Sequence, residues 1–317
     1  MIRLPGLVWP HFSAVGAMAA IVFGMLAAAA VVTFALRRAY PARDFHELVL
    51  RTRSWWWMAA ILFGVLALNA RLLLLLFGLL SFWALKEYVT LLRTRAVDHR
   101  ALIWSFLAIP IQYYWIAAGA FVMFLIFIPV YMFLWLPVRL VLARDPAGFV
   151  MSASQIQWGL MAFVFGLSHL AYLSRMRPLP AATADGITLV LFLLFVTEMS
   201  DIFQYVWGKL IGRTKIFPTI SPNKTWEGLL GGIATTMALS LAVRFLTPFS
   251  AVETLAAALL LTVAGFCGGA VMSAIKRDLG AKDFGTLIPG HGGMLDRVDS
   301  LCYAAPVFFH YVRYFHG

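Results

Sequence analysis

Charged residues are scarce in this sequence. Only 12% of its 317 residues are Asp, Glu, Lys or Arg, whereas 62% are hydrophobic, and the mean hydropathy is +0.86. Soluble domains contain about 45–50% apolar and about 25% charged residues. A soluble protein of this composition would have too little polar surface to face water, so the sequence predicts a polytopic integral membrane protein.

Cysteines are also rare: there are only two, Cys267 and Cys302, each within an apolar run. The sequence contains no C-x-x-C motif and no pattern of paired Cys and His, which argues against a zinc site and against a disulfide framework. It also lacks the G-x-x-x-x-G-K-[ST] motif, so it is not a P-loop enzyme. Any phosphate chemistry must therefore depend on other residues.

Acidic residues are outnumbered, because 14 Asp and Glu stand against 25 Lys and Arg and the formal net charge is +11. In a soluble protein this charge would suggest a nucleic-acid partner. In a membrane protein it is explained by basic cytoplasmic loops and by contact with anionic lipid. We therefore expect membrane lipids, and no nucleic acid, as partners.

Long apolar runs divide the whole chain. A membrane-spanning helix needs about 20 apolar residues. The sequence offers about ten such runs, at 14–36, 55–68, 72–92, 101–117, 119–142, 154–173, 187–205, 229–245, 255–272 and from 301. Because two of them are short, we expect 8–10 transmembrane helices in an all-α fold. We expect one membrane-embedded domain, 1–317, with N-terminal helices in 1–186 and a catalytic half in 187–317.

The basic loops support one topology. If the N-terminus lies outside, the loops at 37–54, 93–100, 139–153, 207–227 and 273–300 all face the cytoplasm, and they carry most of the Lys and Arg. This distribution satisfies the positive-inside rule. It also places the two polar, glycine-containing segments, 207–227 and 273–300, on the same side, where both can contribute to one active site.

Residues 273–299 combine acids with bases between two apolar runs. Asp296 and Asp299 are three residues apart and share a face if the last helix begins near them, and Asp283 adds a third carboxylate. Carboxylates without Cys or His favour a hard cation such as Mg²⁺. The alternative is that acids are simply favoured at a helix N-terminus, which explains one carboxylate more easily than three.

The same stretch carries cations. Ser273, Lys276 and Arg277 line one face of the preceding helix and, with Lys282, suit phosphate groups. The alternative is the ordinary basic flank of a spanning helix. His291 lies between glycines, whose backbone N–H groups can approach a phosphate as an anion nest.

Three acids lie inside predicted spanning helices, where ionisable residues usually have a function. Glu198 and Asp201 are three residues apart near the inner end of the helix at 187–205. Glu87, in the helix at 72–92, follows Lys86 directly. An ordinary interfacial pair with Lys86 explains Glu87 equally well.

A second polar segment surrounds Ser221. Ser221 and Pro222 resemble an N-cap followed by Pro at the first position of a helix, so we expect the next helix to start there. Its free N–H groups, together with Asn223 and Lys224, suit a phosphate. Simple helix capping is the alternative.

Two motifs resemble those of a known family. From Ser273 to Asp299 the chain reads S-x2-K-R-x4-K-D-x-G-x2-I-P-G-H-G-G-x2-D-R-x-D, which resembles the complete signature of the phosphatidate cytidylyltransferases, also called CDP-diglyceride synthases. The segment S-P-x-K-T-W-E-G from Ser221 resembles the family's second motif. The resemblance covers the second half of the chain, and the first half matches only as hydrophobic helices.

The resemblance implies transfer of a cytidylyl group from CTP to phosphatidate, giving CDP-diacylglycerol and pyrophosphate in phospholipid biosynthesis. It implies one or two Mg²⁺ ions, a bacterial inner membrane, an active site facing the cytoplasm and a homodimer. The residues it implicates fall into three groups: metal ligands (Asp201, Asp283, Asp296, Asp299), catalytic cations (Lys276, Arg277, Lys282, His291, Arg297) and substrate-binding residues (Gln204, Ser221, Asn223, Lys224, Ser273).

One departure concerns Gln204, because the family usually has a small residue at this position. Gln204 lies one turn from Asp201, so it is expected to face the same cavity and read the lipid, unless it only bonds a neighbouring helix. Two other functions use similar charges. A CTP-dependent polyprenol or lipid kinase would need a base for a hydroxyl acceptor, and an ion-coupled transporter would spread its acids over several helices.

Overall fold

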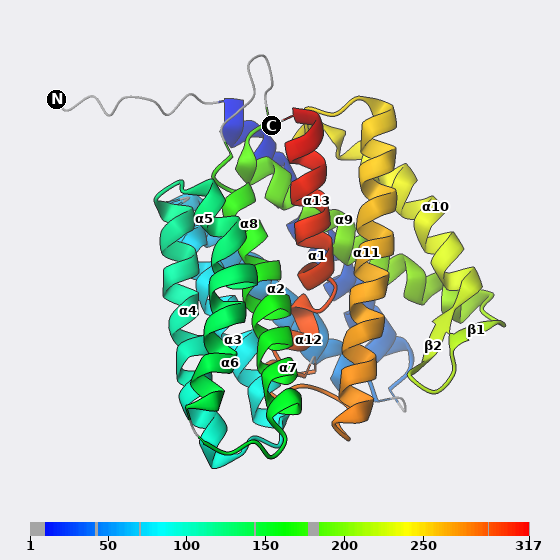
Figure 1. Cartoon of the computed structure of the whole chain (residues 1–317). Coiled ribbons are helices and arrows are strands. Elements are labelled where there is room, and N and C mark those ends of the chain that lie inside the picture. Colours follow the sequence, from blue (N-terminus) through cyan, green and yellow to red (C-terminus); the bar gives the residue numbers. More distant parts are fainter. Residues whose placement is uncertain are drawn as a thin grey trace.

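The computed structural model describes residues 10–41, 44–69, 71–142, 144–176, 184–290 and 292–316. They form a bundle of helices with one small two-stranded sheet on its side (Figure 1). The α-helices are α1 (Pro10–Ala39), α2 (His46–Leu68), α3 (Leu72–Leu91), α4 (His99–Ala117), α5 (Phe121–Ile126), α6 (Phe133–Val141), α7 (Phe149–Gly159), α8 (Leu167–Leu173), α9 (Gly186–Leu210), α10 (Trp226–Ala242), α11 (Ala251–Asp278), α12 (Leu295–Val298) and α13 (Leu301–His316).

Two wide π-helical turns make longer rods from shorter helices. The segment η2 (Phe127–Met132) joins α5 to α6, and η3 (Leu160–Gly166) joins α7 to α8. The short 3-10 turns η1 (Ala96–Asp98) and η4 (Arg244–Leu246) precede α4 and follow α10. The helical segments therefore occupy the apolar ranges that the sequence predicts.

Six helical segments in the described part of the chain are long and apolar enough to cross a membrane: Ala14–Ala39, Leu72–Leu91, Phe121–Val141, Phe149–Leu173, Gly186–Leu210 and Ala251–Asp278. The protein is thus an all-α integral membrane protein. The expected count of 8–10 spans is not supported by this criterion. Two of the remaining helices, α10 and α13, have only 17 and 16 residues, fewer than the roughly 20 that a span needs.

The expected helix start at Ser221 is wrong. Ser221–Thr225 is strand β2, which pairs antiparallel with β1 (Lys215–Phe217). Thr225 is the N-cap of α10, in an extended conformation, and its hydroxyl accepts a hydrogen bond from Gly228 N at 3.1 Å. Hairpin pairing fixes the backbone before Thr225, so the helix begins only where a second N-cap residue is available.

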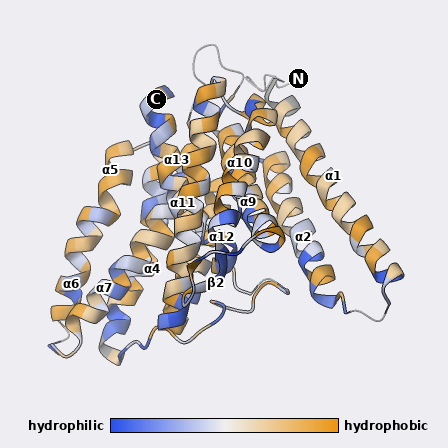
Figure 2. Ribbon diagram, turned by 90° about the vertical axis from the view of Figure 1, so that its right-hand side faces the viewer, coloured by the Kyte–Doolittle hydropathy of each residue, from blue (hydrophilic) through white to orange (hydrophobic). Residues whose placement is uncertain are grey.

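Figure 2 shows the two ends of the described chain at one end of the bundle, whereas β2 and α12 lie away from that end. Hydrophilic colours gather around β2 and α12, whereas the surrounding helices are largely hydrophobic. Helices α9, α11 and α13 pack against one another in the centre. The polar segments therefore meet beside the central helices rather than at the outer face of the bundle.

Glycines let the central helices approach closely. A side chain at Gly232 of α10 would collide with Gln204 of α9, and one at Gly268 of α11 would lie 2.9 Å from the Asp299 carbonyl oxygen. Real Cβ atoms keep about 3.4–4 Å from such neighbours, the ordinary van der Waals range. These contacts bring α9, α10 and α11 to the turn between α12 and α13.

Candidate active site

A half-buried group of acids and bases forms where α9, β2 and the turn between α12 and α13 meet. Asp201 comes from α9, Lys224 from β2, and Asp299 and Ser300 from the turn. The Ser300 hydroxyl donates to Asp201 Oδ2 at 2.7 Å and lies 3.4 Å from Asp299 Oδ1. One hydroxyl thus connects two carboxylates that are 98 positions apart in the numbering of the chain.

Gly269 of α11 lets this group pack closely against the helix. A Cβ atom built on Gly269 of α11 would lie 3.1 Å from Lys224 Nζ, 3.8 Å from Ser300 Oγ and 4.0 Å from Asp299 Oδ2. Three polar side chains therefore meet beside Gly269, and an added methyl group would already crowd Lys224 Nζ.

Lys224 is held against α11. Its Nζ donates to the Phe266 carbonyl oxygen at 2.9 Å and lies 4.2 Å from the centroid of the Phe266 ring. Burial lowers the pKa of Lys224, and the charges of Asp201 and Asp299 act in the opposite direction. The lysine is thus a cation that depends on nearby negative charge, as a phosphate-binding lysine does.

Burial shifts the pKa of Asp299 in the opposite direction. Burial raises the pKa of its carboxyl, whereas the charge of Lys276, the N–H of Ser300 and the charges of Arg297 and Lys224 lower it. Desolvation disfavours the charged form of an acid, and a nearby cation restores it. A cation bound next to Asp299 would therefore stabilise its ionised form.

Two further charged residues act on the same group. The charges of Glu198 and Arg297 interact with Asp201 and Asp299. Arg297 Nε is buried and has no hydrogen-bond partner among the described residues. The guanidinium thus keeps a donor for a ligand that enters the site.

Asp296 faces elsewhere. Its Oδ1 accepts from Lys276 Nζ at 2.8 Å, and its Oδ2 accepts from the amides of Phe284 and Gly293 at 2.8 and 3.0 Å. Asp283 is exposed and lies beside it, because a Cβ on the intervening Gly292 would be 3.2 Å from Asp283 Cβ and 2.8 Å from Asp296 Oδ2. The expected sharing of one volume by Asp283, Asp296 and Asp299 is not seen.

The four acids expected to bind metal therefore form two pairs, Asp201 with Asp299 and Asp283 with Asp296. Among the described residues there is no group of three or more His, Cys, Asp or Glu placed to hold an ion. The three-residue spacing misleads here because α12 ends at Val298, so Asp296 turns to the loop before α12 while Asp299 turns to α9.

Three predicted residues lie at the edge of the site. Arg277 is exposed and connects the hairpin to the end of α11, with Nε 3.4 Å from the Ile220 carbonyl oxygen. Lys282 is exposed on the loop that follows. The Ser273 hydroxyl donates to the Gly269 carbonyl oxygen of its own helix at 2.7 Å.

The other predicted substrate residues are spread out. Asn223 is exposed and Ser221 half-buried on β2. Gln204 packs its side chain against Gly232 of α10, and its Nε2 is buried without a partner in the described part of the chain. His291, a predicted catalytic residue, lies outside the described residues.

The acids that hold the loops were less clear from the sequence. Glu87 accepts hydrogen bonds from two amides at the start of α12, although Lys86 offered a simpler partner. Lys86 instead lies 4.3 Å from the centroid of the Trp83 ring. Glu227 accepts from the amides of Arg213 and Thr214, and backbone N–H groups, its own first, lower the pKa of Glu227 to about 2. The available signal for Glu87 was an acid within a spanning helix.

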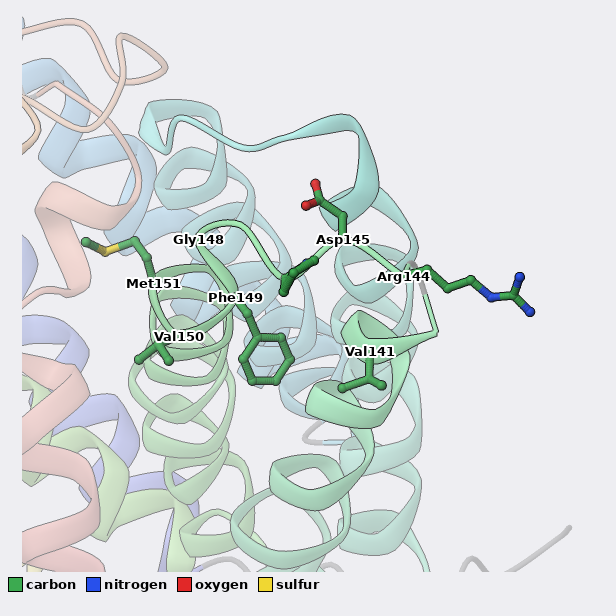
Figure 3. Close-up of a pocket in the computed structure, with 8 residues that line it drawn as sticks. Val141, Arg144, Asp145, Gly148, Phe149, Val150 and Met151 are labelled. Atoms are coloured by element: carbon green, nitrogen blue, oxygen red, sulfur yellow. The ribbon is translucent and has the colours of Figure 1, made fainter.

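A separate surface pocket lies at the turn between α6 and α7 (Figure 3). Its lining comes from that turn and the adjoining helix ends: Val141, Arg144, Asp145, Pro146, Gly148, Phe149, Val150 and Met151. None of the predicted site residues lines it, so it is distinct from the charged group of Asp201, Lys224 and Asp299.

Known proteins resemble this chain over most of its length. The model of the cytidylyltransferase family matches residues 49–315. A protein of Escherichia coli (strain K12), named uncharacterized protein YnbB, is 45% identical over 297 residues, which are 93% of this chain and 97% of that protein.

Two relatives have a named activity. The phosphatidate cytidylyltransferase of Staphylococcus haemolyticus is 34% identical over 157 residues, 49% of this chain and 60% of that protein. The phosphatidate cytidylyltransferase of Staphylococcus aureus (strain COL) is 36% identical over 126 residues, 39% of this chain and 48% of that protein. This chain thus spans only about half of each named relative. The family match, by contrast, runs from α2 to α13 through every segment that builds the site, and the chain belongs to the cytidylyltransferase family.

Proposed function

We propose that the protein transfers a cytidylyl group from CTP to phosphatidate, forming CDP-diacylglycerol and pyrophosphate. The observation that carries this proposal is the half-buried group of Asp201, Lys224 and Asp299 within an apolar bundle. Ionisable side chains among apolar membrane helices usually mark a functional site, and acids with a lysine suit a charged lipid and a metal-bound nucleotide. Membership of the cytidylyltransferase family and relatives named phosphatidate cytidylyltransferase support the same substrates.

The reaction joins two anions. A phosphate oxygen of phosphatidate attacks the α-phosphorus of CTP, a new P–O bond forms, and the bond from the α-phosphorus to the bridging oxygen breaks and releases pyrophosphate. The lipid phosphate is already ionised, so no protein base is required. Lys224, Lys276 and Arg297 lie next to Asp299 and would bind phosphate oxygens and reduce their repulsion.

Asp201 and Asp299 fit a Mg²⁺ ion. Two half-buried carboxylates share one hydroxyl next to Lys224, and Mg²⁺ is commonly held by one or two carboxylates together with substrate phosphates. When bound, the ion would neutralise phosphate charge and favour the departure of pyrophosphate. Asp296 already accepts protein hydrogen bonds, so we assign it to holding Lys276, and Asp283 to the margin of the ion site.

The hairpin and the loop before α12 would receive the nucleotide. Asn223, Arg277 and Lys282 are exposed, and Ser221 and Ser273 lie nearby on β2 and α11. We propose that this end of the molecule faces the cytoplasm in a bacterial inner membrane, with 8–10 spans in total. The charge distribution of the loops supports this orientation.

The test is label transfer by the purified protein in vesicles that contain phosphatidate. CTP labelled at the α-phosphate should give a labelled chloroform-soluble product, and EDTA should stop it. CTP labelled at the γ-phosphate should leave the lipid unlabelled. Transfer of the γ-label instead would establish a lipid kinase, and no lipid label from either nucleotide would refute the proposal.

A matched pair of variants connects the assay to the site. Asp299→Asn should abolish transfer, whereas Asp278→Asn changes an exposed acid at the end of α11 and should leave transfer unchanged. Equal activity of both variants would remove Asp299 from the site.

A further inference from the structure

Glu87 of α3 binds the loop that precedes α12. Its Oε1 accepts a hydrogen bond from Met294 N at 2.9 Å, and its Oε2 accepts one from Leu295 N at 2.8 Å. The side chain is only 8% exposed. Met294, the residue before α12, makes no side-chain cap of its own, so a residue about 200 positions earlier satisfies the first amides of this helix.

The loop is shaped to close around this carboxylate. A Cβ atom on Gly285 would lie 2.9 Å from Glu87 Oε1 and 3.0 Å from its carboxyl carbon, and one on Gly293 would collide with Oε2. Glycine at both positions lets two adjacent segments of the loop approach the Glu87 carboxylate closely. The fit is therefore built from both partners.

Two carboxylates divide the amides of the same turn. Phe284 and Gly293 donate to Asp296, while the next two residues after Gly293 donate to Glu87. Asp296 in turn holds Lys276. The position of α12, and with it the direction in which Asp299 leaves that helix, thus depends on Glu87.

Helix α2 makes a second attachment to the loop. The Ser54 hydroxyl donates to the Pro289 carbonyl oxygen at 2.9 Å, and Arg51 Nε donates to the Gly290 carbonyl oxygen at 3.2 Å. The loop therefore rests on α2 near its middle and on α3 at its C-terminal end.

We propose that Glu87 is a positioning residue, which fixes the 284–295 segment so that Lys276 and Asp299 stand correctly towards the reacting phosphates. Its effect on turnover rests on the proposed function, whereas its hydrogen bonds to the loop do not depend on that function. Both of its oxygens already accept backbone hydrogen bonds, so it acts through the loop.

The two hydrogen bonds to the loop require a carboxylate at position 87. Ionised Glu offers two acceptor oxygens, whereas Gln replaces one with an NH₂ donor. In Glu87→Gln one amide of the pair would face another donor, and charge-assisted bonds would become ordinary ones. Glu87→Asp keeps the charge but shortens the side chain by one methylene.

The experiment combines hydrogen exchange with kinetics. In Glu87→Gln, peptides covering 284–295 should exchange at least about tenfold faster, while peptides from α9 and α11 should be unchanged. Transfer of the α-label should fall about 10- to 100-fold in kcat, as losses of supporting contacts typically do, with little change in KM for CTP. Glu87→Asp should fall between Gln and wild type. Lys86→Gln, the matched control on the adjacent exposed residue, should match wild type in both measurements.

Each result has one meaning. Unchanged hydrogen exchange of 284–295 in Glu87→Gln and Glu87→Asp would refute the claim that Glu87 holds the loop. Faster exchange with undiminished kcat would refute positioning. If the wild-type protein transfers no label, the proposed function fails alone, because exchange still decides whether Glu87 holds the loop. Should Glu87→Gln fail to fold, Glu87→Asp provides the same comparison.

Discussion

Gly269→Ala tests whether the volume between Gly269 and Lys224 receives a ligand. The new methyl carbon would lie 3.1 Å from Lys224 Nζ, closer than an ordinary contact, and 3.8–4.0 Å from Ser300 Oγ and Asp299 Oδ2. A phosphate oxygen bound by Lys224 must approach to about 2.7–2.9 Å. The methyl group and that oxygen cannot both occupy the space.

The expected loss can be estimated. Lys224 Nζ is the end of a flexible side chain and can move by a few tenths of an ångström, so the fold should survive. Replacing Gly with Ala in a compatible helical position stabilises a protein by about 0.4–1 kcal/mol. Misplacing a reacting group by about 1 Å can cost roughly 10²-fold in rate. We therefore expect about 100-fold slower transfer with an unchanged or higher melting temperature.

Gly265→Ala is the control on the same helix. Its Cβ would lie 3.4 Å from Thr197 Cγ2 and 3.5 Å from Ser300 Cβ, which are apolar contacts of ordinary length. Transfer of the α-label and thermal melting should be measured for both variants in the same detergent. Full activity of Gly269→Ala would show that this volume takes no part in catalysis, and equal losses in both variants would point to helix packing instead.

Three other predictions concern charge. Burial raises the pKa of Asp299 and lowers that of Lys224. The value of kcat/KM should therefore fall at acidic pH, as Asp299 is protonated, and at alkaline pH, as Lys224 loses its proton. Lys224→Arg should keep activity to higher pH, and a pH profile without either decline would contradict this assignment. Lys276→Met leaves Asp296 buried and half-paired, a change that costs about 3–5 kcal/mol, so its melting temperature should fall and recover partly with Asp296→Asn; equal stability of the single and double variants would argue against the ion pair. A cysteine introduced at the exposed Thr286 should resist an impermeant thiol reagent applied to intact cells, and efficient labelling would reverse the proposed orientation.

Long apolar runs were enough to predict the helices, because burial in lipid demands long apolar segments with internally bonded backbone. It could not decide how many of them span. Helices α10 and α13 fill predicted ranges yet are short, since the chain at both places also has to enter or leave the polar site.

The composition of the site was easier to predict than its geometry. Asp201, Lys224 and Asp299 meet because α9, β2 and the α12–α13 turn pack together, which no spacing along the chain encodes. The position of Asp296, by contrast, is decided by nearby groups. Its carboxylate binds Lys276 and two backbone amides instead of lying beside Asp299. Glu87 was visible as a buried acid, but its partners lie 207 and 208 positions away.

That separation also has a consequence for biosynthesis. A ribosome adds about 5–20 residues per second, so Glu87 is synthesised roughly 10–40 s before Met294, on the separation of 207 positions. During that interval the Glu87 side chain on α3 has no loop to bind and must find other hydrogen-bond donors, such as water or the insertion machinery. The nascent protein therefore cannot complete its charged centre until its last two helices have been synthesised.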